Sequence, residues 1–548
     1  MNSVKVKNIA EALKEVVKVK KDQTGLIEAR TGNKISFAEL DSRSDRYADY
    51  FQREGLAPGN IVILMVTPSI DFICLTFALF KLGTPVVLID PGMGYKNLLR
   101  CIERVRPEVL IGIPKAILFK KIFPKPFHTV RKTFCCGKSF GLLGPDIRNC
   151  NPQKSDTFQV FQPVEDDLAA IIFTTGSTGP PKGVRYEHSV FAAQLRLIRD
   201  YYGIGFDDID QPAFPLFALF STALGACSIL PDMDAARPAK VDPEKFVASI
   251  KKYKVSYSFG SPAIWNVVSR YCIEKKVVLE SMKRVLMAGA PVPYDLLQRV
   301  TSILPEDSTI YTPYGATESL PVASIKGDEI LNDTWAKSVE GKGTCVGRAL
   351  PGLDIKIMQV ADSPVEHYNK KAELAPYKVG EIIVKGDVVT KSYENNPSET
   401  LLAKMRDGEE FWHRMGDLGY LDDHGRLWFC GRKAHRVKME NQTLYTIPCE
   451  AIINQHQDIY RSALVGINPM ANGNYGAAGI IVEPHKKTTV DREALLSEVR
   501  ALAASSDVTR TIDHFFVHHD FPVDIRHNAK IFREKLTEWA QKEVSPQI

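Results

Sequence analysis

Short apolar runs alternate with helical stretches through the first half of the chain. Residues 61–66 form a continuous apolar run, a helical stretch follows to Leu82 and Gly83, and residues 85–90 form a second apolar run. Such runs are typical of strands buried on both faces, and repeated strand–helix units place parallel strands beneath covering helices. The pattern therefore predicts an α/β fold built on parallel sheets. The alternation returns at residues 105–113, at 168–173 before a helix near Ser189, and at 255–259 before a helix over 263–274.

The pattern changes at Val346. From there, short apolar runs are separated by Gly, Pro and Asp, which predicts a β-rich subdomain over about 346–433. Beyond it the chain is expected to form a small α+β domain, so that an N-terminal domain spans 1–433 and a C-terminal domain spans 434–548. The C-terminal strands are expected at 462–467, 479–482 and 515–518, with helices near 491–504 and 530–542.

The composition excludes several classes of protein. Hydrophobic residues make up 44% and charged residues 25% of 548 residues, which is typical of a globular chain. The 70 Lys and Arg against 65 Asp and Glu leave a net charge of +5, too small over this length to predict nucleic acid as the main partner. Ten cysteines without a C-x-x-C pair indicate reduced thiols and a cytoplasmic location. The longest apolar run, residues 72–80, falls short of the about 20 residues that cross a bilayer.

The segment 112–138 is both basic and aromatic. No Asp or Glu occurs between Glu108 and Asp146, whereas Lys and Arg alternate there with Phe, Ile and Leu. Cationic and apolar side chains both gain free energy at an anionic membrane, so the segment predicts peripheral attachment to a membrane or docking of a partner enzyme. The alternative is a solvated loop that a few aromatic side chains anchor.

The strongest chemical signal follows the apolar run 168–173, where the sequence reads TTGSTGPPKG from Thr174 to Gly183. Glycines let backbone amides approach an anion closely, hydroxyl groups add donors and Lys182 adds a cation, so this loop predicts a polyphosphate site. It is not the Walker loop G-x-x-x-x-G-K-[ST], because Lys182 is followed by Gly183. A glycine-rich hairpin without a ligand is the alternative. The predicted phosphate contacts are Thr174, Thr175, Gly176, Ser177, Thr178, Gly179 and Lys182.

Further motifs follow the loop in a fixed order. They are AGAP at 288–291, YTPYGATES at 311–319, GEIIV at 380–384, SYENNPSET at 392–400, WHRMGDLG at 412–419, GR at 431–432 and KIFR at 530–533. Together with the phosphate loop, this order resembles the adenylate-forming superfamily of acyl-CoA synthetases, peptide-synthetase adenylation domains and luciferases over nearly the whole chain. The resemblance implies an ATP-dependent, AMP-forming enzyme with a large N-terminal domain and a small mobile C-terminal lid.

The resemblance assigns nucleotide contacts to two of these motifs. Tyr314 stacks on adenine, Thr317 contacts the α-phosphate and Glu318 helps to hold Mg²⁺, whose preference for hard oxygen ligands suits a carboxylate. Taken alone, Glu318 would be an ordinary surface carboxylate. The backbone beside adenine and phosphate is assigned to Gly289, Ala290, Pro291 and Gly315.

The remaining assignments concern the ribose and the chemical step. The resemblance gives the ribose hydroxyls to Asp417 and Arg432, and the alternative is an Asp–Arg ion pair that only closes the domain. Lys530 stands at the position of the family's catalytic lysine. Attack of a carboxylate on the α-phosphorus brings two anions together, so a cation placed there stabilises charge present mainly in the transition state.

The chain departs from the acyl-CoA synthetase pattern at two points. Ala218 stands where the gating histidine of a PLFH motif is usual, and Ala434 stands at the usual aspartate hinge. With FPLFALF at 214–220, these departures resemble the OleC-type β-lactone synthetases of olefin biosynthesis. That branch implies a long-chain β-hydroxy fatty acid whose own hydroxyl attacks the acyl-adenylate, so no external thiol is needed. Four apolar side chains are expected either to line an acyl channel or to belong to the hydrophobic core: Phe214, Phe217, Phe220 and Trp265.

Two other functions stay open at this point. The same adenylate formed from ATP and a carboxylic acid would serve an enzyme that transfers the acyl group to CoA or to a carrier protein. A catalytically silent nucleotide-binding scaffold would carry the same loop without the chemistry. A small-molecule carboxylic acid is the expected partner of either enzyme, with ATP and Mg²⁺ as cofactors and CoA needed only in the second.

Overall fold

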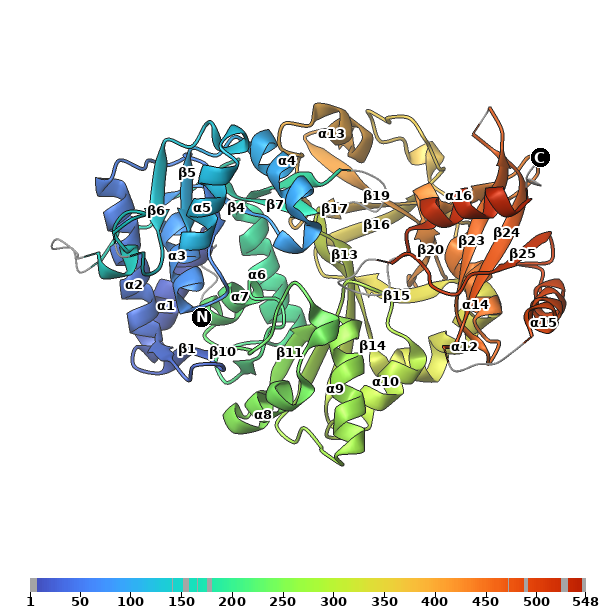
Figure 1. Cartoon of the computed structure of the whole chain (residues 1–548), viewed down its shortest axis with the longest axis horizontal. Helices are drawn as coiled ribbons and strands as arrows, with labels where there is room; N and C mark the ends of the chain where they lie inside the picture. The colour runs from blue at the N-terminus through green and yellow to red at the C-terminus, as the bar shows by residue number, and fades with distance from the viewer. Residues whose placement is uncertain are drawn as a thin grey trace.

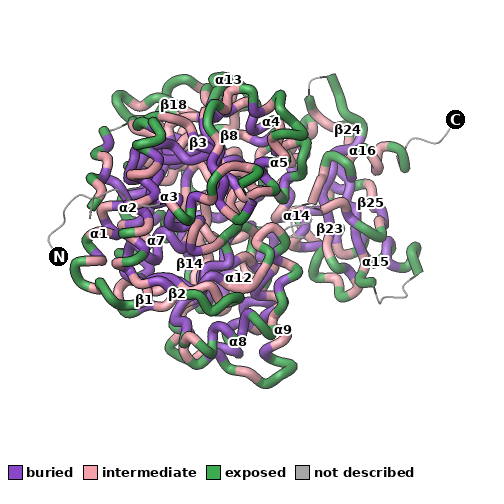
Figure 2. The backbone as a smooth tube through the Cα atoms, turned by 60° about the vertical axis from the view of Figure 1, so that its left-hand side comes forward, coloured by how far each residue is buried: buried purple, intermediate pink, exposed green. Residues whose placement is uncertain are grey.

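The structure is a computed structural model in which one end holds the N-terminal helices and a six-stranded sheet (Figure 1). A 14-stranded sheet spans the middle, and a three-stranded sheet from the C-terminal part lies at the other end. Figure 2 shows buried residues concentrated along the strands and the inner helices, with exposed residues on the outer turns. The residues described are 7–139, 141–150, 157–164, 166–174, 180–471, 473–486, 491–523 and 531–544.

The six-stranded sheet has the order β6-β5-β3-β4-β7-β8, and all neighbours are parallel except β7 and β8. Both of its faces are covered. Val62 and Leu64 of β3 pack with α2, α3 and α6, whereas Ile63 packs with α4 and α5 on the opposite face. The predicted α/β fold is confirmed. The strands are β3 (Val62–Met65), β4 (Val86–Leu88), β5 (Val109–Gly112), β6 (Lys132–Cys135), β7 (Leu168–Thr174) and β8 (Lys182–Glu187).

Helix ends in this part follow from local chemistry. Helix α3 begins after Ser69, whose hydroxyl accepts from the amide of Phe72, and ends at Gly83 with φ 73°. The strand predicted over 105–113 is shorter than expected, because α4 continues to Val105 and the left-handed Arg106 (φ 56°) ends it. The helices are α1 (Ile9–Lys20), α2 (Phe37–Arg53), α3 (Ile70–Leu82), α4 (Tyr95–Val105), α5 (Pro114–Ile122), α6 (His188–Tyr202) and α7 (Phe217–Ala223).

The 14-stranded sheet joins a parallel half to an antiparallel half. Strands β11, β12 and β13 are parallel neighbours, covered by α8, α9 and α10, and the sheet turns antiparallel from β13 onward. Ala323 of β14 pairs with Ala349 of β15, so the predicted β-rich subdomain shares one sheet with the parallel strands. The parallel half and its helices contain β1 (Thr24–Glu28), β9 (Ile209–Asp210), β10 (Cys227–Leu230), β11 (Tyr257–Gly260), β12 (Arg284–Met287), β13 (Thr309–Ala316), α8 (Pro243–Tyr253), α9 (Pro262–Glu274) and α10 (Tyr294–Thr301). The edge strand β2 (Lys34–Ser36) pairs antiparallel with β1.

The antiparallel half provides the strands on which several predicted site residues lie. Strand β19 pairs with both β17 and β20, and β18 pairs with β19 at the edge. The elements are β14 (Ser319–Lys326), α11 (Gly327–Glu329), α12 (Trp335–Lys337), β15 (Thr344–Ala349), β16 (Leu353–Met358), β17 (Gly380–Gly386), α13 (Pro397–Ala403), β18 (Lys404–Asp407), β19 (Glu410–Leu421) and β20 (Leu427–Arg432).

The C-terminal part has its own sheet, in the order β23-β24-β25. Leu464 and Ile480 pack against α14 and α15 on one face, and Val465 and Ile481 pack against α16 on the other. The boundary at residue 434 stays a prediction. The elements are β21 (Val437–Lys438), β22 (Thr443–Leu444), α14 (Thr446–Ile453), β23 (Ile459–Pro469), β24 (Tyr475–Pro484), α15 (Arg492–Ala504), β25 (His514–Val517) and α16 (Arg533–Val544).

All ten cysteines are free thiols. Eight of the cysteines are buried, and only Cys150 and Cys227 are partly accessible. Among the described residues, no helix is both long enough and apolar enough to cross a membrane.

Candidate active site

The predicted phosphate loop connects two paired strand ends. Strands β7 and β8 are antiparallel, and Thr174 at the end of β7 lies opposite Lys182 at the start of β8. A strand rather than a helix follows Lys182, in agreement with the exclusion of a Walker loop. Five of the predicted phosphate contacts lie outside the described residues, namely Thr175, Gly176, Ser177, Thr178 and Gly179.

Lys182 and Glu318 approach each other across the ring of Tyr393. The Lys182 ammonium lies 5.4 Å from the centre of that ring and forms an ion pair with Glu399 of α13. The Tyr393 hydroxyl donates to Oε1 of Glu318 at 2.7 Å. A cation and a carboxylate from distant segments therefore lie within one cluster, as a site for a metal-bound polyphosphate requires.

Tyr314, Asp417 and Arg432 form a second cluster. The Tyr314 hydroxyl donates to Oδ2 of Asp417 at 2.6 Å, and Nη1 of Arg432 lies 2.8 Å from Oδ1. Asp417 is 3% exposed, and its burial raises the pKa of the carboxyl, an effect that Arg432 opposes. Burial, reinforced by the charge of Asp417, raises the pKa of Tyr314 well above its usual value. The predicted ribose residues thus lie together, at the site of the predicted adenine contact.

The backbone predicted to flank adenine lies at the end of two parallel strands. Leu286 of β12 pairs with Tyr311 of β13, so the turn at Gly289, after β12, and Tyr314, further along β13, both lie towards the carboxyl edge of these parallel strands. Gly289 has φ 95°, which favours glycine, and Ala290 and Pro291 continue this turn. A Cβ atom on Gly315 would lie 2.6 Å from the carbonyl oxygen of Ser319. Ligands of open α/β sheets bind at this carboxyl edge.

The backbone around Thr317 and Glu318 is held by neighbouring side chains. The Tyr186 hydroxyl donates to the carbonyl of Thr317. The amide and the hydroxyl of Thr390 donate to the carbonyl of Glu318 at 2.9 and 3.0 Å. Thr317 and Glu318 are therefore fixed beside the Tyr393 hydroxyl.

Lys404 contacts the backbone of Thr390, which holds Glu318. Its ammonium group donates to the carbonyl of Thr390, and burial lowers the pKa of Lys404 to about 7, although Glu318 and Glu187 oppose this shift. His413, which pairs with Lys404 between β18 and β19, has its pKa lowered by burial and by the charge of Lys404. Lys404 thus contacts the Thr390 backbone, and Thr390 in turn holds the carbonyl of Glu318.

The sequence did not single out Tyr393, Glu399 or Lys404. Tyr393 and Glu399 belong to the SYENNPSET motif at 392–400, so the motif was a signal that their segment mattered. Their roles depend on contacts with Glu318 and Lys182, which lie far away in the chain.

The side chains expected to line an acyl channel separate into two groups. Phe217 stacks on Phe259 with ring centres 3.9 Å apart, and Phe214 and Phe220 lie 5.8 and 5.9 Å from Phe217. Phe214 is 46% exposed, so this row extends from the surface into the protein. Trp265 is fully buried in the core beneath the parallel sheet, so it belongs to the core rather than to this row.

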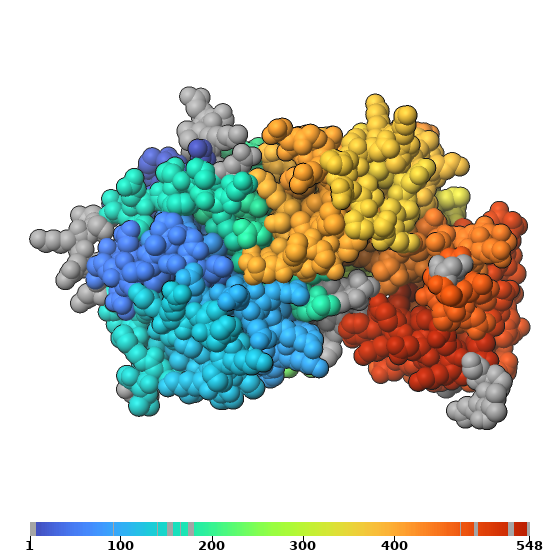
Figure 3. All heavy atoms as spheres, turned by 90° about the horizontal axis from the view of Figure 1, so that it is seen from above, coloured from blue at the N-terminus to red at the C-terminus, as the bar shows by residue number. Residues whose placement is uncertain are grey.

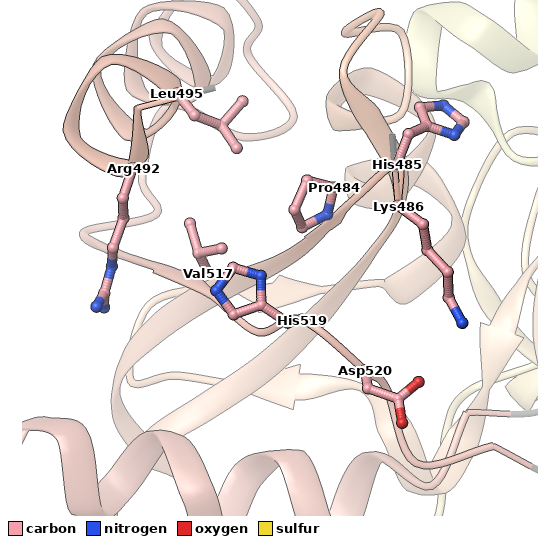
Figure 4. Close-up of a pocket in the computed structure, with 8 residues that line it drawn as sticks. All are labelled: Pro484, His485, Lys486, Arg492, Leu495, Val517, His519 and Asp520. Carbon is pink, nitrogen blue, oxygen red and sulfur yellow. The ribbon is translucent and has the colours of Figure 1, made fainter. Parts of the chain in front are cut away.

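A separate pocket of about 450 Å³ lies in the C-terminal part. Figure 4 shows side chains of Arg492, His519, Lys486 and Asp520 around it. No predicted nucleotide contact lines this pocket, so it is not part of the candidate site.

The Lys182–Glu399 ion pair leads to a test of the phosphate site. Glu399→Gln is expected to tighten ATP binding about two- to fivefold, because it releases Lys182 and removes a negative charge near the phosphates. Calorimetric titration with ATP measures the change. Glu373→Gln is the control, because the Lys356–Glu373 pair is similarly exposed, at 32% and 26% against 30% and 34%. Weaker ATP binding by Glu399→Gln would show instead that this carboxylate helps to hold the nucleotide complex.

Solved structures share the fold of this chain. The amide bond synthetase McbA from Marinactinospora thermotolerans aligns with a TM-score of 0.78 at 20% identity, covering 97% of this chain and 99% of that one. ATP-bound MatB from Rhodopseudomonas palustris also aligns with a TM-score of 0.78 at 20% identity, covering 98% and 100%. At this level of identity the likeness shows the fold, which this chain shares with the amide bond synthetase and with MatB over nearly its whole length.

Sequence comparisons then identify the family. The family model described as AMP-binding enzyme matches residues 13–394. The chain is 39% identical to the olefin beta-lactone synthetase of Stenotrophomonas maltophilia over 98% of both chains, and 39% identical to the enzyme of that name from Xanthomonas campestris over 93% of this chain and 91% of that one. The chain therefore belongs to the AMP-binding enzyme family, in the group that includes these two synthetases. The resemblance inferred from the motifs is confirmed.

Proposed function

We propose that the protein activates a long-chain β-hydroxy fatty acid with ATP and closes the resulting acyl-adenylate to a β-lactone. The observation that carries this proposal is the 39% identity, over 98% of both chains, to an enzyme named olefin beta-lactone synthetase. The clusters around Lys182 and Asp417 support the proposal, because they bring together charged side chains suited to phosphates and to ribose hydroxyls.

In the first half-reaction, a carboxylate oxygen of the acid attacks the α-phosphorus of ATP and pyrophosphate leaves. Lys182 and the predicted loop would hold the outer phosphates, with Thr317 at the α-phosphate. Tyr314 would contact adenine, and Asp417 with Arg432 would bind the ribose hydroxyls. Lys530 would stabilise the charge that develops in the transition state.

Mg²⁺ fits the donor set at Glu318. One carboxylate oxygen of Glu318 accepts a hydrogen bond from the Tyr393 hydroxyl. Mg²⁺ is commonly bound by one or two carboxylates together with substrate phosphates. Bound Mg²⁺ would offset the negative charge of the phosphates. Tyr393 would then orient the Glu318 carboxylate towards them.

In the second half-reaction, the β-hydroxyl oxygen attacks the acyl carbonyl, the hydroxyl proton is released and AMP leaves, which closes a four-membered ring. The nucleophile is part of the substrate, so its capture costs little entropy. Ala218 stands at the position where the resemblance to acyl-CoA synthetases would lead us to expect a gating histidine. It is fully buried in α7. No histidine side chain can therefore gate a thiol tunnel from this position.

Product analysis with and without CoA tests the proposal. With a β-hydroxy fatty acid, ATP and Mg²⁺, we expect AMP and β-lactone in equal amounts without CoA, measured by chromatography and mass spectrometry. An unsubstituted acid of the same length is the matched control, and it should release pyrophosphate without giving a lactone. Strict dependence on CoA would assign the chain to acyl-CoA ligation. A lack of pyrophosphate release with every acid would assign it to a silent scaffold.

The carboxylic acid is the partner that this reaction needs. Attachment to a membrane is a separate proposal, because it depends on the surface formed by residues 112–138 and not on the nucleotide site.

A further inference from the structure

An exposed apolar face surrounds helix α5. Leu118 and Ile122 lie one turn apart on this helix and are 48% and 69% exposed, and Phe123 directly after it is 40% exposed. Tyr95 at the start of α4 is 72% exposed, and Leu142 in a nearby turn is 82% exposed. We call Tyr95, Leu118, Ile122, Phe123 and Leu142 the α5 face.

The side chains of the α5 face lie close together. Phe119 connects three of its aromatic neighbours, with ring centres 5.7 Å from Tyr95, 4.9 Å from Phe123 and 6.2 Å from the buried Phe127. Leu142 lines the same hollow as Lys121 and Pro124. Figure 3 shows the light blue to cyan atoms of this region together on one side of the molecule.

Exposed lysine side chains flank the α5 face. Lys115, Lys121 and Lys125 are exposed, and among the residues that the structure describes none of the three forms an ion pair. No acidic residue occurs between Glu108 and Asp146 to neutralise them along the chain. Apolar tips flanked by unpaired ammonium groups are typical of surfaces that insert into the headgroup region of an anionic bilayer.

We propose that the α5 face docks this enzyme onto an anionic lipid bilayer. Tyr95, Ile122 and Leu142 enter the interface, and Lys115, Lys121 and Lys125 pair with lipid phosphates. An anionic bilayer suits this surface, because apolar tips can enter the headgroup region while the flanking ammonium groups meet lipid phosphates.

The α5 face is also linked to the candidate active site. Its Tyr95 begins α4, and near the end of α4 the carbonyl of Arg104 accepts from Nδ2 of Asn395 at 2.9 Å. Asn395 belongs to the segment that carries Tyr393 and Glu399. Helix α4 therefore connects the α5 face at one end to the segment of Tyr393 and Glu399 at the other.

Vesicle sedimentation with the full chain tests the proposal. We expect binding to vesicles of phosphatidylcholine with about 30% phosphatidylserine, which supplies an anionic surface, and no binding to pure phosphatidylcholine. Lys115→Gln, Lys121→Gln and Lys125→Gln should each weaken binding roughly fivefold, and Ile122→Asp with Leu142→Asp should abolish it. Equal binding to both vesicles, or full binding by the Ile122→Asp, Leu142→Asp variant, would overturn the proposal.

Matched controls separate docking from misfolding. Ile273→Asp and Val278→Asp change apolar side chains that are 46% and 48% exposed elsewhere on the surface, and they should leave vesicle binding unchanged. ATP–pyrophosphate exchange with a short soluble acid should be equal in all these variants. No binding of the unchanged protein to anionic vesicles, with its exchange activity intact, would show that the face serves a protein partner or none, and the proposal would be wrong.

Discussion

Replacing Lys530 with alanine is expected to lower the rate of carboxylate-dependent ATP–pyrophosphate exchange at least about 100-fold, with the Kd for ATP changed less than about threefold. A cation that stabilises negative charge present only in the transition state raises the rate of the chemical step. It does not strengthen the binding of ATP in the ground state. Rapid-quench measurement of acyl-adenylate formation and calorimetric titration with ATP measure the two quantities separately.

Lys530 itself lies outside the described residues, but the chain on either side of it is anchored. The amide of Phe532 donates to the carbonyl of Pro522 at 2.8 Å, and Nη2 of Arg533 donates to Oε2 of the buried Glu450 at 2.8 Å. A local substitution at Lys530 should therefore leave the C-terminal core intact.

Two variants control for charge and for stability. Lys542→Ala removes an exposed lysine of α16 and should have no effect on exchange. Lys530→Arg keeps the charge but changes its geometry, and it should recover only part of the activity. Near-normal exchange by Lys530→Ala would show that another cation stabilises the transition state.

The parallel strands could be predicted because each one is a continuous run of apolar residues in the sequence. The runs at 61–66 and 168–173 are continuous and apolar, since both faces of their sheet are covered, and the structure places β3 and β7 there. The union of the β-rich part with the parallel sheet could not be predicted in this way. This union depends on the pairing of β14 with β15. The local pattern of apolar residues predicts a strand but does not say with which other strand it pairs.

The candidate site shows the same division. The composition of the loop predicted Lys182, and the resemblance of the later motifs to a known family assigned Glu318, Asp417 and Arg432. The Lys182–Glu399 pair and the support of Glu318 by Tyr393 could not be predicted, because the partners come from segments far apart in the chain. Such contacts are decided by packing.

Replacing Asp417 with asparagine is expected to weaken ATP binding roughly 10- to 100-fold, which is the loss of a hydrogen bond to a charged group worth about 1.5–3 kcal/mol. Asparagine keeps the shape of the buried side chain but loses the charge that accepts from a ribose hydroxyl. The Tyr314 hydroxyl can still donate to the amide oxygen, and Arg432, whose side chain is 43% exposed, stays solvated. The variant should therefore fold, which thermal unfolding checks.

Deoxy nucleotides distinguish a ribose contact from an ion pair that only closes the domain. The unchanged protein should bind 2′-deoxy-ATP or 3′-deoxy-ATP more weakly than ATP, and Asp417→Asn should lose that discrimination, because the variant no longer has the carboxylate that the hydroxyl would meet. Asp422→Asn is the matched control, since Asp422 is also buried and ion-paired to an arginine in the same β19–β20 hairpin. It should lower the melting temperature and leave the discrimination intact. If Asp417→Asn also keeps the discrimination against deoxy nucleotides, Asp417 only closes the domain and does not bind the ribose hydroxyls.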